Sequence, residues 1–143
     1  MRLRQLMTTN VRTCQPDTPL VDVARIMADV NCGFVPVVEG GRPVGTITDR
    51  DIVIRAVANG KDIRTAKARE FMTSPVVTAS PDTDAHQAAD LMADKQIRRL
   101  CVVEGDRLVG VVALGDLATE EIHTDEAGEA LSSISEPAQP GAH

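Results

Sequence analysis

The stretch "VGTITDRDIVIRAV" occupies residues 44–57, and a related stretch, "VGVVALGDLATEEI", occupies residues 109–122. Both stretches begin with Val-Gly, and both keep one aspartate at the same place. The first stretch also has Thr48, whereas the second has Ala113 at the corresponding position. The chain therefore contains one pattern twice, and one of the two copies lacks a hydroxyl group.

The similarity extends well beyond these two stretches. When the chain is shifted by 65 residues, 19 of the 46 positions between residues 7 and 52 are identical without a gap, where chance gives about three. The segment "MTTNVRTCQPDT" (7–18) aligns with "MTSPVVTASPDT" (72–83), and "VVEGGRPVG" (37–45) aligns with "VVEGDRLVG" (102–110). An internal repeat of this length predicts two structurally equivalent units.

Each copy is predicted to fold as strand, helix, strand, strand and helix (β-α-β-β-α). A short helical turn around Met7 or Met72 comes first, and a Pro-Asp-Thr turn then offers Asp and Thr side chains as helix N-caps. Glycines in "EGGR" and "EGDR" suit the turn of a hairpin. The expected strands are 11–13, 34–38 and 46–48 in the first copy and 76–78, 100–103 and 111–113 in the second, with second helices beginning at Asp49 and Leu114.

The first helix of each copy is predicted from apolar residues that recur at helical spacing. One face of each helix should therefore be buried, and the methionines on that face are interpreted as packing residues. The apolar positions are Leu20, Val23, Ala24, Ile26 and Met27 in the first copy and Ala85, Ala88, Ala89, Leu91 and Met92 in the second.

One copy of about 50 residues is too small to bury its sheet well, whereas two copies can do so together. We therefore expect an α/β (α+β) fold of two repeats, related by a pseudo-twofold axis and packed through their sheets. Asn59-Gly60 is expected to stop a helix. The tail is acidic and is expected to fray from about Pro137, although "TDEAGEALSSI" is compatible with a marginal helix. The predicted boundaries are repeat 1 at 1–60, linker at 61–70, repeat 2 at 71–120 and tail at 121–143.

Composition places the chain among globular proteins and excludes some functions. Its 143 residues are 43% hydrophobic and 25% charged, with two Phe and no Trp or Tyr. An aliphatic core suits a small layered fold, but it lacks the aromatic platforms on which single-stranded nucleic acids stack. The net charge of −6 repels a phosphate backbone, so we expect no general nucleic-acid binding.

The same composition bears on location. No run approaches the roughly 18 apolar residues of a membrane span, and "MRLRQLMTTN" lacks the apolar segment of a signal peptide. Cys14, Cys32 and Cys101 are an odd number without a C-x-x-C spacing, so we expect free and mostly buried thiols. Together these features predict a cytoplasmic protein.

The tandem β-α-β-β-α order and the motif G-φ-φ-[ST]-x-x-D resemble the CBS domain pair, also called a Bateman module. The resemblance covers about residues 1–120: "VGTITDRDIV" matches the motif fully, and "QIRRLCVVEGDRLVGVV" is similar to the matching stretch of a second CBS repeat. It implies an adenosine-containing ligand (AMP, ADP, ATP, NAD or S-adenosylmethionine) in clefts between the repeats. It also implies a disc-shaped homodimer and a role in sensing metabolites, with no required cofactor.

The chemistry of Thr48 and Asp51 fits such a ligand. Thr48 is expected where a strand ends and a helix begins, and helix N-termini favour phosphate. The two carboxylate oxygens of Asp51 can accept hydrogen bonds from both hydroxyls of a ribose. The alternative is that T-x-x-D is a capping box without a ligand. The sequence leaves both interpretations open.

The resemblance also implies which residues form each cleft, because each CBS cleft joins the Thr/Asp segment of one repeat to the first strand and helix-to-strand corner of the other. The paired arginines at one corner suit a phosphate group, although they can equally be a solvated face. The predicted ligand-binding residues are Gly45, Ile47, Thr48, Arg50, Asp51, Val76, Val77, Thr78, Arg98 and Arg99. The second cleft is predicted to be degenerate, with Val11, Thr13, Ala113 and Asp116, and with Gly33-Phe34 in place of the arginines. We therefore expect one nucleotide per chain.

Other chemistry is less well supported by the sequence. His86, His123, His143 and the cysteines have no metal-ligand spacing, so we expect no metal site. There is no nucleophile elbow, P-loop or G-x-G-x-x-G motif, so we expect no enzyme. The sequence predicts a non-catalytic adenine-nucleotide sensor. The alternative is a CBS scaffold without a ligand that acts as a structural dimer or binds an unknown protein partner.

Overall fold

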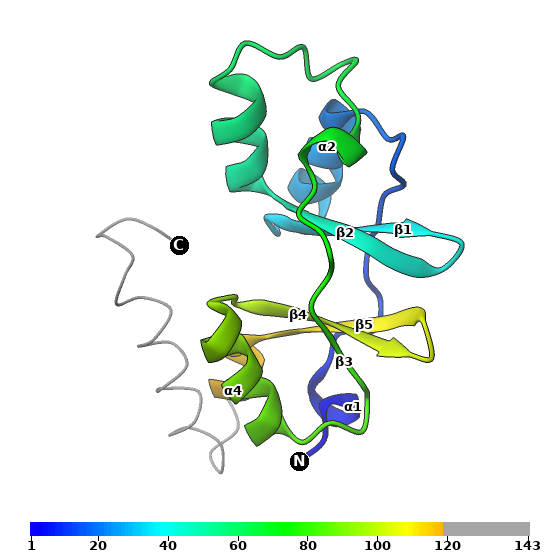
Figure 1. The fold of residues 1–143 in the computed structure, drawn as a ribbon, viewed down its shortest axis with the longest axis vertical. Coiled ribbons are helices and arrows are strands. Elements are labelled where there is room, and N and C mark those ends of the chain that lie inside the picture. The colour runs from blue at the N-terminus through cyan, green and yellow to red at the C-terminus, as the bar shows by residue number, and fades with distance from the viewer. Residues whose placement is uncertain (119–143) are drawn as a thin grey trace. The chain divides into compact units, whose positions relative to one another are not determined.

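The computed structural model describes residues 1–118, so the predictions for the tail lie outside the described residues. The chain forms two compact units (Figure 1). Among the described residues, unit 1 contains 1–10, 77–105 and 109–118, and unit 2 contains 11–76 and 106–108. Each unit therefore combines segments that are far apart in the sequence.

Unit 2 is built on the antiparallel hairpin of β1 and β2, in which Phe34 faces Thr48. Glycines at positive φ form the turn, with Gly40 at 62° and Gly41 at 85°. Val35 and Ile47 of the hairpin belong to a buried cluster that also includes Leu20 of α2. The elements of this unit are α2 (Leu20–Val30), β1 (Phe34–Glu39), β2 (Arg42–Thr48), η1 (Asp51–Val57, a π-helix) and α3 (Ala68–Phe71).

Unit 1 has a three-stranded sheet in the order β3-β4-β5, and β3 runs parallel to β4. Its core contains fully buried Leu3, Met92, Leu100 and Leu117. The elements are α1 (Leu3–Leu6), β3 (Thr78–Ala79), α4 (Ala85–Lys95), β4 (Arg99–Glu104), β5 (Arg107–Ala113) and α5 (Leu114–Ala118). The mixed helix and strand content confirms the predicted fold class.

The amphipathic helices are as predicted. α2 and α4 bury their apolar faces, including Met27 and Met92, and both end in a left-handed residue, Asn31 in α2 and Gln96 in α4. Gly60 has a φ of 70° after η1, which confirms the predicted helix stop. Thus the helical spacing of apolar residues located both helices correctly.

The predicted N-caps are wrong. Thr18 Oγ1 accepts a hydrogen bond from Gln15 N, so it closes the turn before α2 instead of capping the helix. Thr83 does the same in the second copy. The residue that caps α4 is Asp84, whose carboxylate accepts from His86 N at 3.0 Å, whereas the N-cap of α2 is a proline without a side-chain acceptor.

The first strand of copy one, predicted at residues 11–13, is also wrong. Only Cys14 forms a bridge there, with Val37, whereas β3 extends over two residues. Pro36 stands where Cys101 stands in the second copy, and proline has no N–H with which to donate to the next bridge. The strand in copy two, predicted at residues 76–78, begins two residues later and ends one residue later, at Thr78–Ala79.

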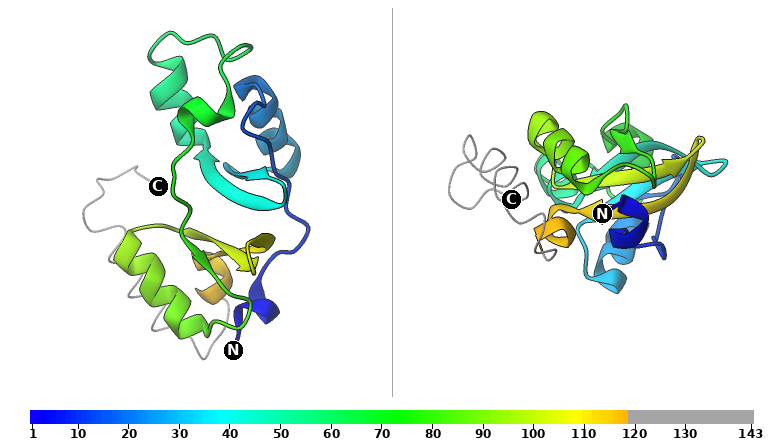
Figure 2. Two further views of the ribbon diagram at one scale, coloured as in Figure 1. Left: turned by 45° about the vertical axis from the view of Figure 1, so that its right-hand side comes forward. Right: turned by 90° about the horizontal axis from the view of Figure 1, so that it is seen from below.

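The short helix in front of each copy folds into the other copy's unit. In unit 1, Leu3 N donates to Thr83 O at 3.0 Å, and Thr8 exchanges backbone hydrogen bonds with Val111. In unit 2, α3 makes the equivalent contacts, with Thr73 and Thr46 in reciprocal pairing. Figure 2 shows α1 against the unit that is built mainly from the second copy. The repeats in the sequence and the compact units in space thus divide the chain differently.

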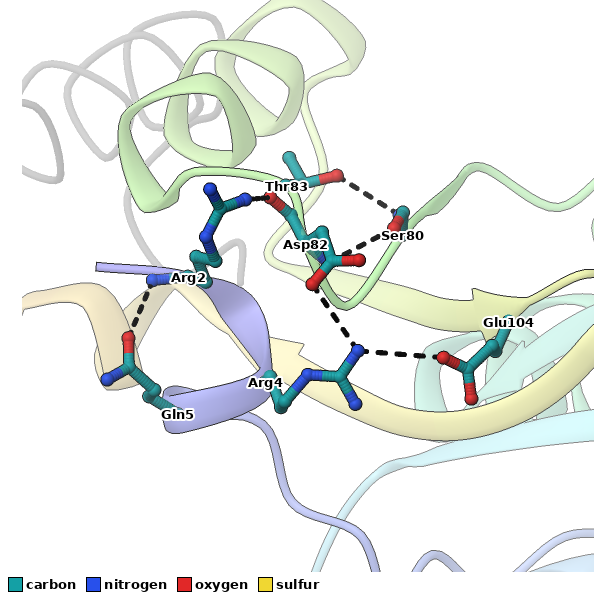
Figure 3. A network of polar contacts seen from close by, with 7 residues as sticks. All are labelled: Arg2, Arg4, Gln5, Ser80, Asp82, Thr83 and Glu104. Atoms are coloured by element: carbon teal, nitrogen blue, oxygen red, sulfur yellow. Dashed lines mark hydrogen bonds and ion pairs between the residues drawn. The ribbon is translucent and has the colours of Figure 1, made fainter.

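A polar network fixes α1 in unit 1 (Figure 3). Arg2 donates to the backbone carbonyl of Asp82, and Arg4 Nη2 lies 3.3 Å from Asp82 Oδ1 and 3.5 Å from Glu104 Oε2. In unit 2, Arg69 forms the corresponding ion pair with Asp17. The exchanged segments are therefore held by equivalent charges in both units.

Candidate ligand site

Thr48 and Asp51 bond to each other across the start of the second helix of copy one. Thr48 N donates to Asp51 Oδ2 at 2.9 Å, and Asp51 N donates to Thr48 Oγ1 at 3.2 Å. This is a reciprocal capping box, in which each side chain satisfies a backbone N–H of the other residue. The other carboxylate oxygen, Oδ1, is 3.9 Å from Arg55 Nη1. The Asp51 side chain is 19% exposed, so a ligand can reach it without opening the core.

The second copy keeps half of this arrangement. Ala113 N donates to Asp116 Oδ2 at 2.8 Å, which matches the bond from Thr48 N to Asp51. Ala113 has no hydroxyl and cannot make the reciprocal bond. The loss of the threonine thus removes one capping interaction as well as one group that could contact a ligand.

Two of the predicted site residues, Gly45 and Ile47, are buried in unit 2. A Cβ atom on Gly45 would overlap Met72 Sδ, and one on Gly110 would lie 2.8 Å from Met7 Sδ. Both glycines therefore admit a methionine from an exchanged segment. Ile47 is fully buried in the core. Of the predicted site residues in this segment, Thr48, Arg50 and Asp51 are the ones with exposed or partly exposed side chains.

The corner between helix and strand differs between the copies for a steric reason. In copy one, Gly33 O accepts from Asp49 N, and a Cβ atom on Gly33 would lie 2.5 Å from the Asp49 carboxylate carbon. In copy two, Arg98 O accepts from Leu114 N at 2.8 Å. Aspartate at the helix start of copy one thus requires glycine at the corner. In copy two, leucine replaces the aspartate and arginine replaces the glycine.

Arg98 has one buried group without a partner. Its Nε is inaccessible to solvent and makes no hydrogen bond to any described residue. A buried donor without an acceptor is unfavourable, and a guanidinium group prefers an anionic acceptor. Arg99, next in the chain, is exposed at the start of β4. Sequence reasoning marked both arginines, but it did not distinguish the buried Nε.

The remaining predicted site residues are divided between the units. Thr78 is exposed in β3, which pairs with β4, so it lies on the strand next to Arg99 in the same sheet. Val77 packs on the core of unit 1, and Val76 is in unit 2. In the second predicted site, Val11 and Thr13 belong to unit 2, and Ala113 and Asp116 belong to unit 1. Both predicted clefts draw on both units, and their assembly stays a prediction.

Two of the three thiols, those of Cys14 and Cys101, are buried. Burial raises the pKa of Cys14 to about 11 and that of Cys101 to about 12, so both stay protonated at neutral pH. Cys32 is partly exposed, and all three are free. Among residues 1–118, no three His, Cys, Asp or Glu side chains are grouped in a way that could hold a metal ion. No helix in this part of the chain has the length and apolarity needed to span a membrane.

A family model described as "CBS domain" matches residues 3–57 and again residues 68–123. The chain belongs to the CBS domain family. It is similar to the CBS domain-containing protein YhcV of Bacillus subtilis, with 42% identity over 133 residues that cover 93% of this chain and 94% of the relative. The tandem CBS arrangement predicted from the internal repeat is confirmed.

Two solved CBS structures are informative. The CBS domain protein PAE2072 from Pyrobaculum aerophilum complexed with AMP matches with a TM-score of 0.79 and 27% identity, covering 90% of this chain and 98% of that one. Hypoxic Response Protein I with two coordinated zinc ions matches with a TM-score of 0.78 and 30% identity, covering 84% and 98%. The sequence alone carries the same likeness, with 31% identity over 116 residues to Hypoxic response protein 1 of Mycobacterium tuberculosis, covering 80% of this chain and 81% of the relative.

Proposed function

We propose that this tandem CBS chain is a non-catalytic regulatory module that binds one phosphate-bearing adenosine ligand between its two repeats. The observation that carries the proposal is the match, over nine-tenths of the chain, to a CBS protein whose structure contains AMP. The proposal assigns the ribose hydroxyls to Asp51 and the phosphate to Arg98 and Arg99.

The residues of copy one support the first assignment. Asp51 uses Oδ2 for the Thr48 backbone, which leaves lone pairs on both carboxylate oxygens. The capping box fixes the carboxylate before a ligand arrives, and this lowers the entropic cost of binding. The capping function and the ligand function are therefore compatible in one side chain.

The residues of copy two support the second assignment. The unpartnered Arg98 Nε needs an acceptor, and a phosphate oxygen is the natural one. This favours AMP, ADP, ATP or NAD over S-adenosylmethionine, whose sulfonium group is cationic. The mirror-image site has glycine and phenylalanine at the corresponding corner, so the proposal gives one ligand to each chain.

The second candidate function is a CBS scaffold that binds another protein without a ligand. It is favoured by the capping box itself, because Thr48 and Asp51 are fully explained by their mutual hydrogen bonds. In this alternative the chain is a structural homodimer or a partner of another protein. The cytoplasmic location predicted from the sequence fits both candidates.

A thermal-shift panel with AMP, ADP, ATP, NAD and S-adenosylmethionine tests the proposal, using an extrinsic dye because the chain has no Trp or Tyr. A ligand at 100 times its dissociation constant stabilises the fold by about 2.7 kcal/mol. Asp51→Asn should abolish the shift. Asp116→Asn is the matched control, because Asp116 makes the same bond to a backbone N–H in copy two. If no nucleotide shifts the transition of the wild type, the scaffold function replaces this proposal.

A further inference from the structure

The net charge of the chain comes from one part of the sequence, residues 119–143, which we call the acidic segment. All 15 Lys and Arg residues lie within residues 1–118, together with 15 of the 21 Asp and Glu residues, so these charges cancel there. The acidic segment contains no Lys or Arg and carries the whole net charge of −6. Segments with several charges of one sign often act as interaction segments. Its six acidic residues are Glu120, Glu121, Asp125, Glu126, Glu129 and Glu136.

A cationic group that lacks an acceptor lies in the unit from which the acidic segment continues. Arg98 Nε is buried and has no hydrogen-bond partner among the described residues. Leu114 N donates to Arg98 O at 2.8 Å, so α5 begins at the same corner as Arg98. Arg98 and α5 both belong to unit 1, and α5 ends at Ala118. The acidic segment therefore starts close to the arginine.

The length of the chain decides which acidic residues can reach this corner. The five residues of α5 rise about 7.5 Å along the helix axis, away from the corner. Residues 119–124 can span at most about 20 Å. Asp125 and Glu126 therefore have enough chain before them to return past α5 to the corner, whereas Glu120 and Glu121 follow the helix too closely.

We propose that Asp125 and Glu126 act as an intramolecular competitor of the ligand, with their carboxylates bound at Arg98 when no nucleotide is present. This inference rests on the proposed function, because it concerns the regulation of the same site. A guanidinium group binds carboxylate and phosphate with similar geometry, so the two anions exclude each other at one arginine. The buried Nε then has an acceptor both with and without the ligand.

Competition of this kind sets the ligand concentration at which the module responds. A group linked to the same chain by a short segment has an effective concentration on the order of millimolar. A nucleotide must displace it, and the apparent dissociation constant rises in inverse proportion to the fraction of chains whose site is open. The acidic segment therefore shifts the response to higher nucleotide concentrations.

Calorimetric titration of the full chain with AMP tests the proposal. Asp125→Asn/Glu126→Gln removes two charges while keeping the size of both side chains, and it should lower the dissociation constant for AMP at least ~3-fold. Glu129→Gln/Glu136→Gln removes the same charge further along the chain and should leave the dissociation constant unchanged. Equal gains in both variants would assign the effect to general repulsion of phosphate and overturn the proposal. An unchanged dissociation constant in Asp125→Asn/Glu126→Gln would overturn it as well.

A measurement without nucleotide separates this inference from the proposed function. In the isotope-labelled chain, the Nε–H group of Arg98 gives an NMR signal that is assigned by its loss in Arg98→Lys. This signal should move in Asp125→Asn/Glu126→Gln and stay in place in Glu129→Gln/Glu136→Gln. A signal that is unaffected by both variants, in a chain that binds AMP, overturns the competitor and leaves the proposed function intact. A signal that moves as expected in a chain that binds no AMP overturns the proposed function and retains the contact between the acidic segment and Arg98.

Discussion

The starts of η1 in unit 2 and α5 in unit 1 occupy equivalent positions of the repeat, yet they are stabilised differently. Both keep the bond from a strand-end N–H to an aspartate, made by Asp51 in one unit and Asp116 in the other. Unit 2 adds a threonine hydroxyl and a corner glycine that makes room for Asp49. Unit 1 has none of these and carries arginines at the corner instead. The comparison shows that the differences between the copies are coupled, because aspartate at the helix start goes with glycine at the corner, and leucine at the helix start goes with arginine at the corner.

A substitution in an exchanged helix should have the largest effect on the free energy of unfolding. Leu3 of α1 is fully buried in unit 1, whereas Ala68 stands at the equivalent place in unit 2. Leu3→Ala leaves a cavity and should lower the free energy of unfolding by about 2–5 kcal/mol in chemical denaturation. Arg4→Ala, an exposed neighbour in the same helix, should change it far less. Equal effects of the two substitutions would show that α1 is not part of the core of unit 1.

A substitution at the corner between α2 and β1 should have the next largest effect on the free energy of unfolding. Gly33→Arg copies the residue of the second repeat, but its side chain collides with the Asp49 carboxylate. Such overpacking should cost about 1–3 kcal/mol in the same denaturation assay. The double variant Gly33→Arg/Asp49→Leu reproduces the second repeat and should recover most of that loss. If the double variant is no more stable than Gly33→Arg, the two positions are not coupled as described.

Substitutions at the capping box should change the free energy of unfolding less, and they should act differently in the two units. Thr48→Ala removes one capping bond and should destabilise the chain by about 1 kcal/mol. Ala113→Thr can form the missing bond to Asp116 N and should leave stability equal or raise it. Differential scanning calorimetry of the two variants measures both. Destabilisation by Ala113→Thr would mean that unit 1 has no space for the hydroxyl.

The buried thiols provide the smallest effect near neutral pH. The folded-state pKa of Cys14 and Cys101 is raised above the ordinary value of 9.0, so the folded state retains protons that the unfolded state loses. Their contribution to stability is complete below about pH 9 and is lost as the pH rises through about 11 to 12. Iodoacetamide at pH 8 should therefore modify Cys32 first. Rapid labelling of Cys14 or Cys101 in the folded chain would contradict their burial.

The sequence predicted much of this fold because the repeat gave each element twice. The hairpin turns, the buried faces of α2 and α4 and the starts of the second helices all follow from local patterns. The exchange of α1 and α3 could not be predicted in this way, because no local pattern distinguishes packing on one repeat from packing on the other. The pairing of Met7 with Gly110 and of Met72 with Gly45 is the structural sign of that exchange.

For the candidate site, the sequence predicted where Thr48 and Asp51 lie along the chain but not the contacts that hold them, and the ligand-binding role of the site residues stays a prediction. Thr48 and Asp51 were correctly placed at the junction of strand and helix, and the capping alternative proved to be present. The missing first strand depends on Pro36, an effect of one absent N–H that a pattern of apolar residues does not reveal. The constraint of Asp49 on Gly33 is a contact between residues 16 positions apart in the sequence, which only a folded chain can show.

Isothermal titration calorimetry with AMP tests the central claim most directly, because it counts the binding sites. The asymmetry of the two repeats predicts one site per chain, lost in Asp51→Asn and retained in Asp116→Asn. Two equivalent sites, or a loss in Asp116→Asn with binding kept in Asp51→Asn, would contradict the assignment of the ligand to the cleft that combines Thr48 and Asp51 with Arg98 and Arg99.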